Sequence, residues 1–295
     1  MLEGLLVKVK GGFYFVMVPD GGVLRCRARG RLKDGEVHLL VGDRVEISRG
    51  NVEDGVVERI LPRKNSLTRP PIANVDQAVL VMTLREPPLD LQLIHRIIAA
   101  AALAELSIVL CFNKMDLVTL AEEKACVKKY AEAFKGCGYK IVYTSSLTGE
   151  GLEVLRELIT GKVSVLAGPS GTGKSTLLNK LKPGLILRSA ALSLKLQRGR
   201  HTTRHVELIT LSDDTLVADT PGFQRLDLMR ISPRSLASLF PEIHLREGGC
   251  RFNSCLHHHE PACAVKEAVQ QEEIVTWRYD QYLALLEEAV RQDKT

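Results

Sequence analysis

A glycine-rich stretch in the second half of the chain has the residue types and spacing of a phosphate-binding loop. Its sequence, Gly168-Pro-Ser-Gly-Thr-Gly-Lys-Ser175, fits the pattern G-x-x-x-x-G-K-[ST]. Glycines let backbone N–H groups turn toward phosphate oxygens, and the positive end of a following helix dipole attracts the same anions. We expect Lys174 to reach the β- and γ-phosphates of a nucleotide and the Ser175 hydroxyl to bind Mg²⁺. The loop residues expected to contact the nucleotide are Gly168, Pro169, Ser170, Gly171, Thr172, Gly173, Lys174, Ser175 and Thr176.

A second group of polar residues predicts that the base of this nucleotide is guanine. The Asp116 carboxylate can accept hydrogen bonds from the guanine N1–H and exocyclic amine, whereas adenine would leave it unpaired. The stem of Lys114 can pack along the base, and the backbone N–H groups of Ser145 and Ser146 can reach the guanine O6. An Asn-Lys-x-Asp sequence alone could be a surface turn, but together with the phosphate loop it indicates a guanine-nucleotide site. The residues expected to hold the base are Asn113, Lys114, Met115, Asp116, Ser145 and Ser146.

The sequence Asp219-Thr-Pro-Gly222 follows a short apolar stretch and supplies a further candidate Mg²⁺ ligand. An aspartate at the end of a strand can hold Mg²⁺ through water, and a glycine just after it can sense the γ-phosphate. We therefore expect Asp219 near the metal and Gly222 near the nucleotide. Because an Asp-Thr-Pro-Gly turn is common, this motif is informative only beside the other two.

Three of the seven cysteines cluster with a histidine near the end of the chain. The pattern Cys250-x4-Cys255-x-His257-x5-Cys263 supplies three thiolates and one imidazole. Such a closed set is typical of one structural, tetrahedral Zn²⁺, which contributes folding energy where a region is too small for its own core. His258 and His259 adjoin His257, so spacing alone does not select the histidine. A chance cluster of buried thiols is the alternative.

The elements that would position these motifs alternate between strand and helix. Continuous apolar runs predict strands buried on both faces, and helical patterns separate them. This alternation predicts a parallel, doubly wound α/β sheet with the motifs at the carboxyl ends of its strands. The predicted strands are residues 78–83, 107–112, 140–144 and 163–167, and the predicted helices are residues 91–106, 119–135, 151–160 and 176–181.

Residues 1–66 read differently, as five short strands separated by turns, which predicts a small β-barrel of the OB type. In its third strand Arg25, Arg27 and Arg29 alternate and are expected to project from one face. Such a face calls for an anionic partner such as RNA, although a solvated outer face is an equal alternative. The polar, Pro-rich residues 62–71 are interpreted as a linker.

The remaining divisions follow from composition and pattern. We expect a nucleotide-binding domain over residues 67–232 and a small zinc-binding α-helical domain over 233–295, whose last helix, with Trp277 and Tyr282, packs on the cysteine cluster. A net charge of +5 permits a polyanionic partner. The lack of a long apolar run predicts a cytoplasmic protein without a membrane partner, and we expect a monomer.

The order of the motifs is their most specific property. In ordinary GTPases the phosphate loop comes first, but here the base-recognition residues 113–116 and 145–146 precede it. This rotation resembles the circularly permuted GTPases, and in detail the RsgA (YjeQ) family of small-subunit ribosome assembly GTPases. The resemblance covers nearly the whole chain, including Arg-Lys-Asn before the linker, Gly-Arg-His-Thr-Thr at 199–203 and the cysteine cluster.

The resemblance implies several roles that the residues alone do not. Residues 199–203 would be the first switch, with Thr202 or Thr203 completing the Mg²⁺ shell, and His257 would be the zinc ligand. Phe223 stands where many GTPases have a water-orienting glutamine, so His201 becomes the candidate for that task, a loop histidine without chemistry being the alternative. The family usually has a third threonine where this chain has Arg204.

The resemblance also implies the biological setting. We expect slow hydrolysis of GTP to GDP, stimulated by the small (30S) ribosomal subunit, whose rRNA the protein would bind late in maturation. One alternative is an RNA-binding scaffold that the nucleotide only stiffens, which Phe223 keeps open. A P-loop kinase or ATPase is the other, and Asp116 argues against it.

Overall fold

The computed structural model describes residues 1–33, 38–49, 54–68, 70–182, 206–212, 214–219 and 231–293. Its first part is a closed barrel in the order β1-β2-β3-β5-β4, in which β3 and β5 run parallel. Alternation of apolar and polar residues places Leu6, Val16 and Val57 in a fully buried barrel core. The OB-type prediction is confirmed. The strands are β1 Leu2–Lys10, β2 Phe13–Met17, β3 Val23–Ala28, β4 Arg44–Arg49 and β5 Asp54–Ile60, with the short helix α1 at Gly30–Lys33.

The predicted linker contains regular structure. Strands β6 Ser66–Thr68 and β7 Pro71–Ala73 pair as an antiparallel hairpin, and Ile72 at its centre is fully buried. The interpretation of residues 62–71 as a plain linker was therefore wrong. A three-residue strand that carries a proline gives little periodic signal, which explains the error.

Hydrogen bonds across this segment form what we call the barrel joint, made of Asp43, Arg63, Ala73 and Asn74. The Arg63 guanidinium donates to both carboxylate oxygens of the fully buried Asp43, at 2.6 and 2.9 Å. The Asn74 side chain donates to the Gly42 carbonyl at 2.8 Å. Gly42 has a φ of 91°, and a Cβ there would overlap the carbonyl oxygen of Ala73, so only glycine fits this approach. The barrel is thus fixed on the next domain.

The central sheet has the order β10-β9-β8-β11-β13-β12, parallel except for β12. Side chains of β8 divide between its faces, because Leu80 packs with α2 and α3 whereas Val79 packs with α4 and α5. The doubly wound prediction is confirmed. The strands are β8 Gln77–Met82, β9 Ser107–Phe112, β10 Lys140–Tyr143, β11 Val163–Ala167, β12 Leu208–Ser212 and β13 Thr215–Asp219; the helices are α2 Leu91–Leu103, α3 Ala121–Gly136, α4 Leu152–Ile159 and α5 Lys174–Leu181, and η1 is Met115–Leu117.

The C-terminal domain is built from short helices and one long helix. The hydroxyl groups of Tyr279 and Tyr282 donate to the carbonyls of His257 and Leu256, at 2.6 and 2.8 Å. The last helix therefore packs on the cysteine cluster, as predicted. The elements are η3 Ala237–Leu239, α7 Pro241–His244, η4 Glu247–Gly249, α8 Ala264–Gln270 and α9 Thr276–Asp293.

A buried arginine holds this domain on the central one. Arg278 of α9 is 1% exposed; it donates to Glu242 at 2.6 Å and to the Nε2 atom of His95, on α2, at 2.8 Å. The same guanidinium lies 5.2 Å from the Phe134 ring. Trp277 stacks edge-on against His95 and Phe134, so its predicted place on the cysteine cluster was wrong. We call His95, Phe134, Glu242, Trp277 and Arg278 the C-terminal joint.

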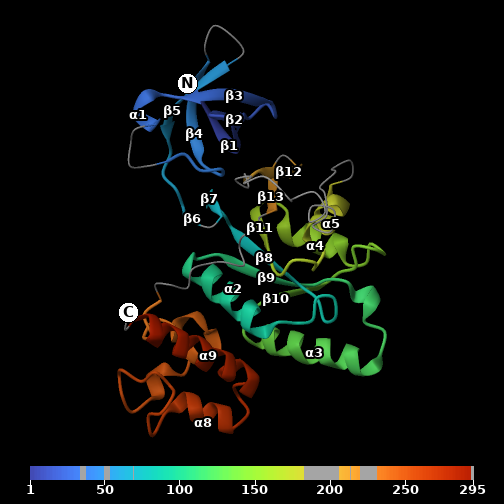
Figure 1. Cartoon of the computed structure of the whole chain (residues 1–295), viewed down its shortest axis with the longest axis vertical. Helices are drawn as coiled ribbons and strands as arrows, with labels where there is room; N and C mark the ends of the chain where they lie inside the picture. Colours follow the sequence, from blue (N-terminus) through green and yellow to red (C-terminus); the bar gives the residue numbers. More distant parts are fainter. Residues whose placement is uncertain are drawn as a thin grey trace, which may run out of the picture.

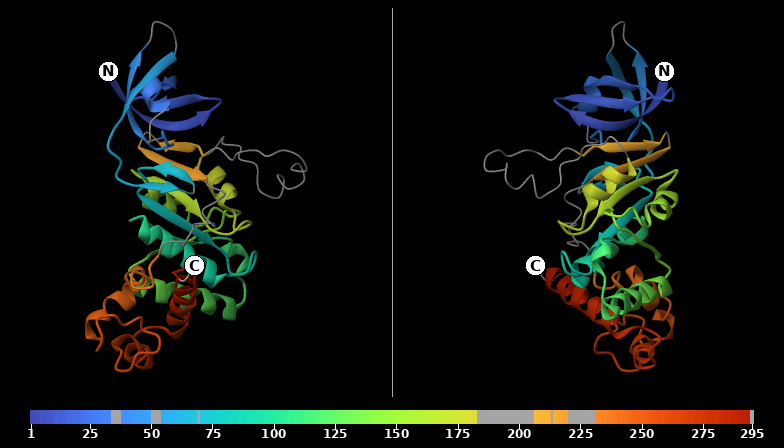
Figure 2. Two further views of the ribbon diagram at one scale, coloured as in Figure 1. Left: turned by 60° about the vertical axis from the view of Figure 1, so that its left-hand side comes forward. Right: turned by 90° about the vertical axis from the view of Figure 1, so that its right-hand side faces the viewer.

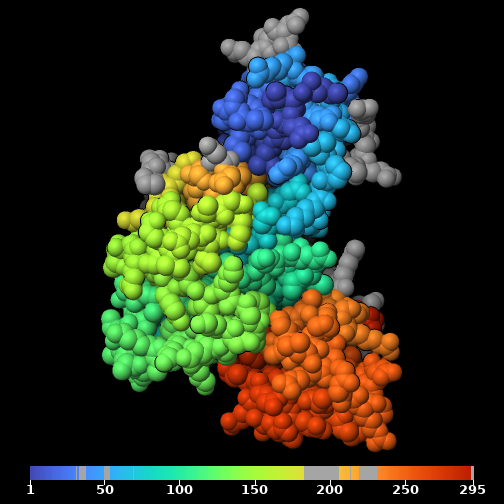
Figure 3. All heavy atoms as spheres, turned by 180° about the vertical axis from the view of Figure 1, so that it is seen from behind, coloured from blue at the N-terminus to red at the C-terminus, as the bar shows by residue number. Residues whose placement is uncertain are grey.

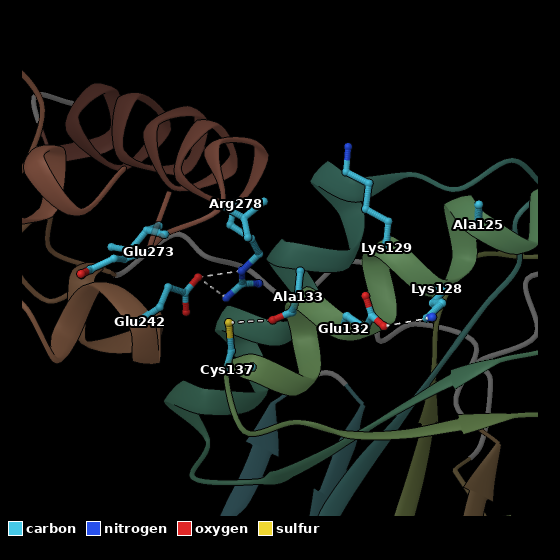
Figure 4. Close-up of a pocket in the computed structure, with 12 residues that line it drawn as sticks. Ala125, Lys128, Lys129, Glu132, Ala133, Cys137, Glu242, Glu273 and Arg278 are labelled. Atoms are coloured by element: carbon cyan, nitrogen blue, oxygen red, sulfur yellow. Dashed lines mark hydrogen bonds and ion pairs between the residues drawn. The ribbon is translucent and has the colours of Figure 1, made fainter. Parts of the chain in front are cut away.

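Two members of this joint, Glu242 and Arg278, line a cavity of about 650 Å³ between α3 and the C-terminal domain (Figure 4). Burial and the Arg278 charge lower the pKa of His95 to about 3, so its imidazole is neutral. Its Nδ1–H donates to the Leu91 carbonyl at 2.6 Å and its Nε2 accepts from Arg278. One tautomer therefore satisfies both ring nitrogens.

The three parts follow one another along the long axis of the molecule (Figures 1 and 2). The barrel lies at one end, the C-terminal domain at the other, and the sheet with its helices between them (Figure 3). Among the described residues, no helix combines the length and apolar character that a membrane span needs.

Candidate functional site

The glycine-rich loop lies between β11 and α5, as the sequence predicts. Gly173 precedes α5 in a left-handed conformation, with φ 92°, and a Cβ there would lie 2.6 Å from the Asn113 side chain. The Thr172 side chain, fully buried, donates to the Pro169 carbonyl at 3.0 Å. The Lys174 ammonium donates to the carbonyls of Gly168 and Pro169, at 2.8 and 2.7 Å. The loop therefore has the strand-to-helix context that phosphate binding requires.

The base-recognition residues follow β9 and β10, which lie beyond β8 from β11, the strand that leads into the phosphate loop. Ser145 donates its hydroxyl hydrogen to the Asp116 carboxylate at 2.5 Å, which orients the group expected to read the guanine edge. The Ser145 N–H donates to the Glu150 carbonyl at 3.0 Å, so its expected bond to guanine O6 is not supported. In this structure Ser145 instead donates its hydroxyl hydrogen to Asp116.

A buried hydrogen-bond network joins the two loops. The Asn113 amide donates to the Thr172 carbonyl at 2.8 Å, and its side-chain oxygen accepts from the hydroxyl groups of Thr144 and Ser146. Asn113 is 1% exposed and Thr144 is fully buried. Sequence reasoning missed Thr144, because its only signal is that it directly precedes Ser145. The network brings base and phosphate recognition together at the carboxyl edge of one sheet, the place where open α/β sheets bind ligands.

The structure describes only some of the residues predicted to bind Mg²⁺ or to act in catalysis. β13 ends at Asp219, and its register pairs Asp219 with Leu166 of β11, next to the phosphate loop. The Asp219 side chain lies outside the described residues, and so do His201, Thr202, Thr203, Gly222 and Phe223. Ser175 begins the first turn of α5, beside Lys174.

The cysteine cluster forms a compact set of metal-ligand atoms. One ligand atom from each of Cys250, Cys255, His257 and Cys263 lies within 4.8 Å of all the others. The His257 Nδ1 atom is 3.5 Å from the sulfurs of both Cys250 and Cys263. His258 and His259 stack on each other instead, so the geometry selects His257.

The donor set fits a metal ion. Three sulfurs and one nitrogen surrounding a small space match tetrahedral Zn²⁺, and no position is left for substrate. Burial raises the pKa of the Cys255 thiol to about 12 and lowers that of His257. A cation would therefore have to displace thiol protons, and its charge would offset the cost of burying thiolates.

The three barrel arginines predicted to bind RNA have partners within the chain. Arg25 and Arg27 both lie over the Phe13 ring, at 4.9 and 5.2 Å from its centre, and so share a face. Arg25 also pairs with Asp54 at 2.6 Å, and Arg29, just beyond β3, pairs with Glu58. These exposed pairs weaken the argument from unrelieved repulsion, and RNA contact by this face stays a prediction.

The fold and the two linked loops define a P-loop GTPase. Because its base-recognition strands precede the phosphate loop in the chain, it is a circularly permuted GTPase. The family model described as RsgA GTPase matches residues 60–229, and that of the RsgA N-terminal domain matches residues 3–57. The chain belongs to the RsgA GTPase family.

Relatives and solved structures agree with this assignment. The small ribosomal subunit biogenesis GTPase RsgA of Moorella thermoacetica is 44% identical over 294 residues, covering 100% of this chain and 99% of its own. The one from Halalkalibacterium halodurans is 43% identical with the same coverage. The crystal structure of YjeQ from Thermotoga maritima has a TM-score of 0.87 at 37% identity, covering 98% of each chain. YloQ, described as a circularly permuted GTPase, has a TM-score of 0.83 at 36% identity, covering 100% of this chain and 96% of its own.

Proposed function

We propose that this protein hydrolyses GTP to GDP and phosphate during maturation of the small ribosomal subunit, slowly alone and faster when bound to that subunit. The observation that carries the proposal is the Asn113 network, which joins a guanine-type base loop to a phosphate loop at one sheet edge. Full-length identity of 44% to a relative named for small ribosomal subunit biogenesis supports the setting.

The residues divide the work of binding and hydrolysis. Asp116, held by Ser145, accepts the guanine N1–H and amine hydrogens, and the Lys114 stem covers the base. Backbone N–H groups of residues 168–176, apart from Pro169, hold the phosphates, and Lys174 turns from the loop carbonyls to the β- and γ-phosphates. Mg²⁺, held by Ser175, Asp219 and Thr202 or Thr203, would neutralise charge that develops on the phosphate oxygens. His201 orients the attacking water, because Phe223 has no hydrogen-bonding group.

The other two domains have separate roles in this proposal. One structural Zn²⁺ held by Cys250, Cys255, His257 and Cys263 stabilises the C-terminal domain. The barrel contacts rRNA through the face that carries Arg25 and Arg27, with Arg29 at its end. A protein that matures ribosomal subunits belongs in the cytoplasm, where the subunits are, and its working form is a monomer.

Measured turnover tests the proposal. GTP hydrolysis by the purified protein is compared with and without small ribosomal subunits, with large subunits as the control, at a stated salt concentration. Strong stimulation by the small subunit alone is the expected result. Turnover that stays negligible with every subunit would favour the alternative, an RNA-binding scaffold that nucleotide stiffens, which the sequence keeps open through Phe223. His201→Ala is expected to abolish the stimulated part of turnover.

A further inference from the structure

The segment between β8 and α2 lies against both parts of the nucleotide site, although none of its residues belongs to a nucleotide-binding motif. The Lys114 ammonium donates to the Glu86 carbonyl at 2.6 Å. The neighbouring Pro87 lies beside the phosphate loop, where its Cδ atom would be 3.6 Å from a Cβ placed at Gly171. Residues 84–89, which we call the bridging loop, therefore bond to the base lysine and lie next to the phosphate loop.

Two attachments fix the shape of the bridging loop. Thr83, which directly follows β8 and is 3% exposed, donates its hydroxyl hydrogen to the Pro87 carbonyl at 2.6 Å, which closes the turn that contains Glu86. Arg85 pairs with Glu123 at 3.4 Å, and the Glu123 carboxylate accepts from the Thr119 N–H at 3.1 Å, before α3. The loop is thus tied to its own strand and to the segment that follows Asp116.

Lys114 needs such support because of where it stands in the chain. Its backbone is left-handed, with φ 59° and ψ 39°, and its side chain is only half-buried. A lysine stem that carries four rotatable bonds loses much freedom when it is laid along a base. A fixed carbonyl acceptor for the ammonium removes part of that freedom before the nucleotide arrives, which favours binding.

From these contacts we propose that Thr83 is a positioning residue for nucleotide binding. Its hydroxyl bond to the Pro87 carbonyl fixes the turn that presents the Glu86 carbonyl, and the Glu86 carbonyl holds Lys114 in the orientation that covers the base. This inference rests on the proposed nucleotide site and adds a residue outside its motifs. The bond that Thr83 supports is the one to Lys114, on the base side of the site, so Thr83 sets the affinity for GTP and GDP alike and leaves the chemical step to other groups.

The test is a double-mutant cycle on GDP affinity, measured with a fluorescent GDP analogue and by calorimetry. Loss of one supporting hydrogen bond predicts that Thr83→Val weakens GDP binding about three- to tenfold, with KM for GTP raised by the same factor and kcat unchanged. Thr83→Ser keeps the hydroxyl and restores the affinity. Thr83→Val should weaken the binding of inosine diphosphate, which lacks the exocyclic amine, by the same factor as that of GDP, because the substitution does not affect Asp116.

The second arm of the cycle is Lys114→Met, which keeps an apolar stem and removes the ammonium. If Thr83 acts through Lys114, Thr83→Val has no further effect on GDP affinity in that background. An equal loss in both backgrounds would show a general structural effect and overturn the proposal. So would wild-type affinity for Thr83→Val itself.

Matched controls separate this proposal from the proposed function. Thr160→Val removes another hydroxyl that donates to a carbonyl, that of Arg156 at 2.8 Å, at the end of α4. It is expected to leave GDP affinity unchanged. Melting temperatures without nucleotide detect a folding defect in Thr83→Val, in which case the comparison of Thr83→Ser with the wild type decides. A wild-type protein that binds no GDP would contradict the nucleotide site itself, whereas tight wild-type binding with an unaffected Thr83→Val contradicts only the role of Thr83.

Discussion

Replacing Glu242 by glutamine should destabilise the C-terminal joint, although the new side chain has almost the same shape as the old one. Among the described residues, Glu242 supplies the only carboxylate bonded to Arg278, and the two side chains are 12% and 1% exposed. The change keeps the size of the side chain and removes one negative charge. Arg278 then remains buried among Phe134, Tyr139 and Phe240 without a compensating anion.

The expected cost follows from that burial. Removing one partner of a buried ion pair costs about 3–5 kcal/mol, because the other charge stays out of water. Glu242 retains slight exposure, so the lower end applies, about 3 kcal/mol, or about 100-fold in the equilibrium between the closed and open joint. The neutral His95 adds no charge compensation, since its pKa is about 3. Pairing Glu242→Gln with Arg278→Met removes both charges and should recover part of the loss.

The chain contains its own reporter for this equilibrium. Trp277 is the single tryptophan of the sequence, and it packs edge-on against His95, Tyr130 and Phe134 within the joint. Its fluorescence during urea unfolding therefore follows the joint directly. Glu288→Gln is the matched control, because Glu288 pairs with the more exposed Arg96, and it should cost less than about 1 kcal/mol.

A double-mutant cycle decides the matter. Coupling of at least about 2 kcal/mol between Glu242→Gln and Arg278→Met is expected for groups in direct contact at a buried site. Strictly additive costs, or a Glu242→Gln cost no larger than that of Glu288→Gln, would refute the reasoning that a desolvated charge holds the joint.

Three further predictions concern His95, the cysteine cluster and Asp116. His95 is neutral when folded, with a pKa of about 3 against an ordinary 6.5, so stability is full above pH 6.5 and falls as pH decreases below it, by about 1.4 kcal/mol per unit. In urea unfolding between pH 6.5 and 5, His95→Gln should flatten this dependence, and an unchanged slope would contradict it. Chelation of zinc, or Cys263→Ser, should unfold the C-terminal domain and remove the one zinc ion expected per chain. Circular dichroism measures the loss of helix and metal analysis measures the loss of zinc; full helicity without metal would argue against a structural site. Asp116→Asn should lower the preference for GDP over xanthosine diphosphate by more than about 100-fold in competition binding, because an amide offers a donor where guanine needs an acceptor; an unchanged preference would remove Asp116 from base recognition.

Local patterns predicted those features whose causes are local. The phosphate loop is a contiguous run with fixed spacing, and β11 and α5 flank it as the pattern requires. The sheet followed from apolar runs that are buried on both faces, and the cysteine cluster lies within one short segment. In each case neighbours in sequence supply the physics, so reading the chain suffices.

Features that depend on distant partners escaped sequence reasoning. Arg63 reads as a linker charge, because its partner Asp43 lies on the barrel, twenty positions earlier. Arg25 seemed to need an external anion, because the parallel register that brings Asp54 opposite it is set by barrel closure. Helical periodicity placed Trp277 on an apolar face, but periodicity does not say which neighbour covers that face. Tertiary pairing decided all three.

The barrel joint also gives the molecule a fixed length. Since Asp43, Arg63 and Asn74 fasten the barrel to the sheet, the barrel face that carries Arg25 and Arg27 keeps a constant separation from the C-terminal domain at the other end of the molecule (Figure 2). A rigid protein with binding surfaces at both ends can contact two sites on a partner at once only when those sites are separated by the matching distance. Where the partner's sites lie at another spacing, only one end binds, with the lower affinity of a single contact. Discrimination between stages of an assembling particle can then come from measured distance, without any base being read.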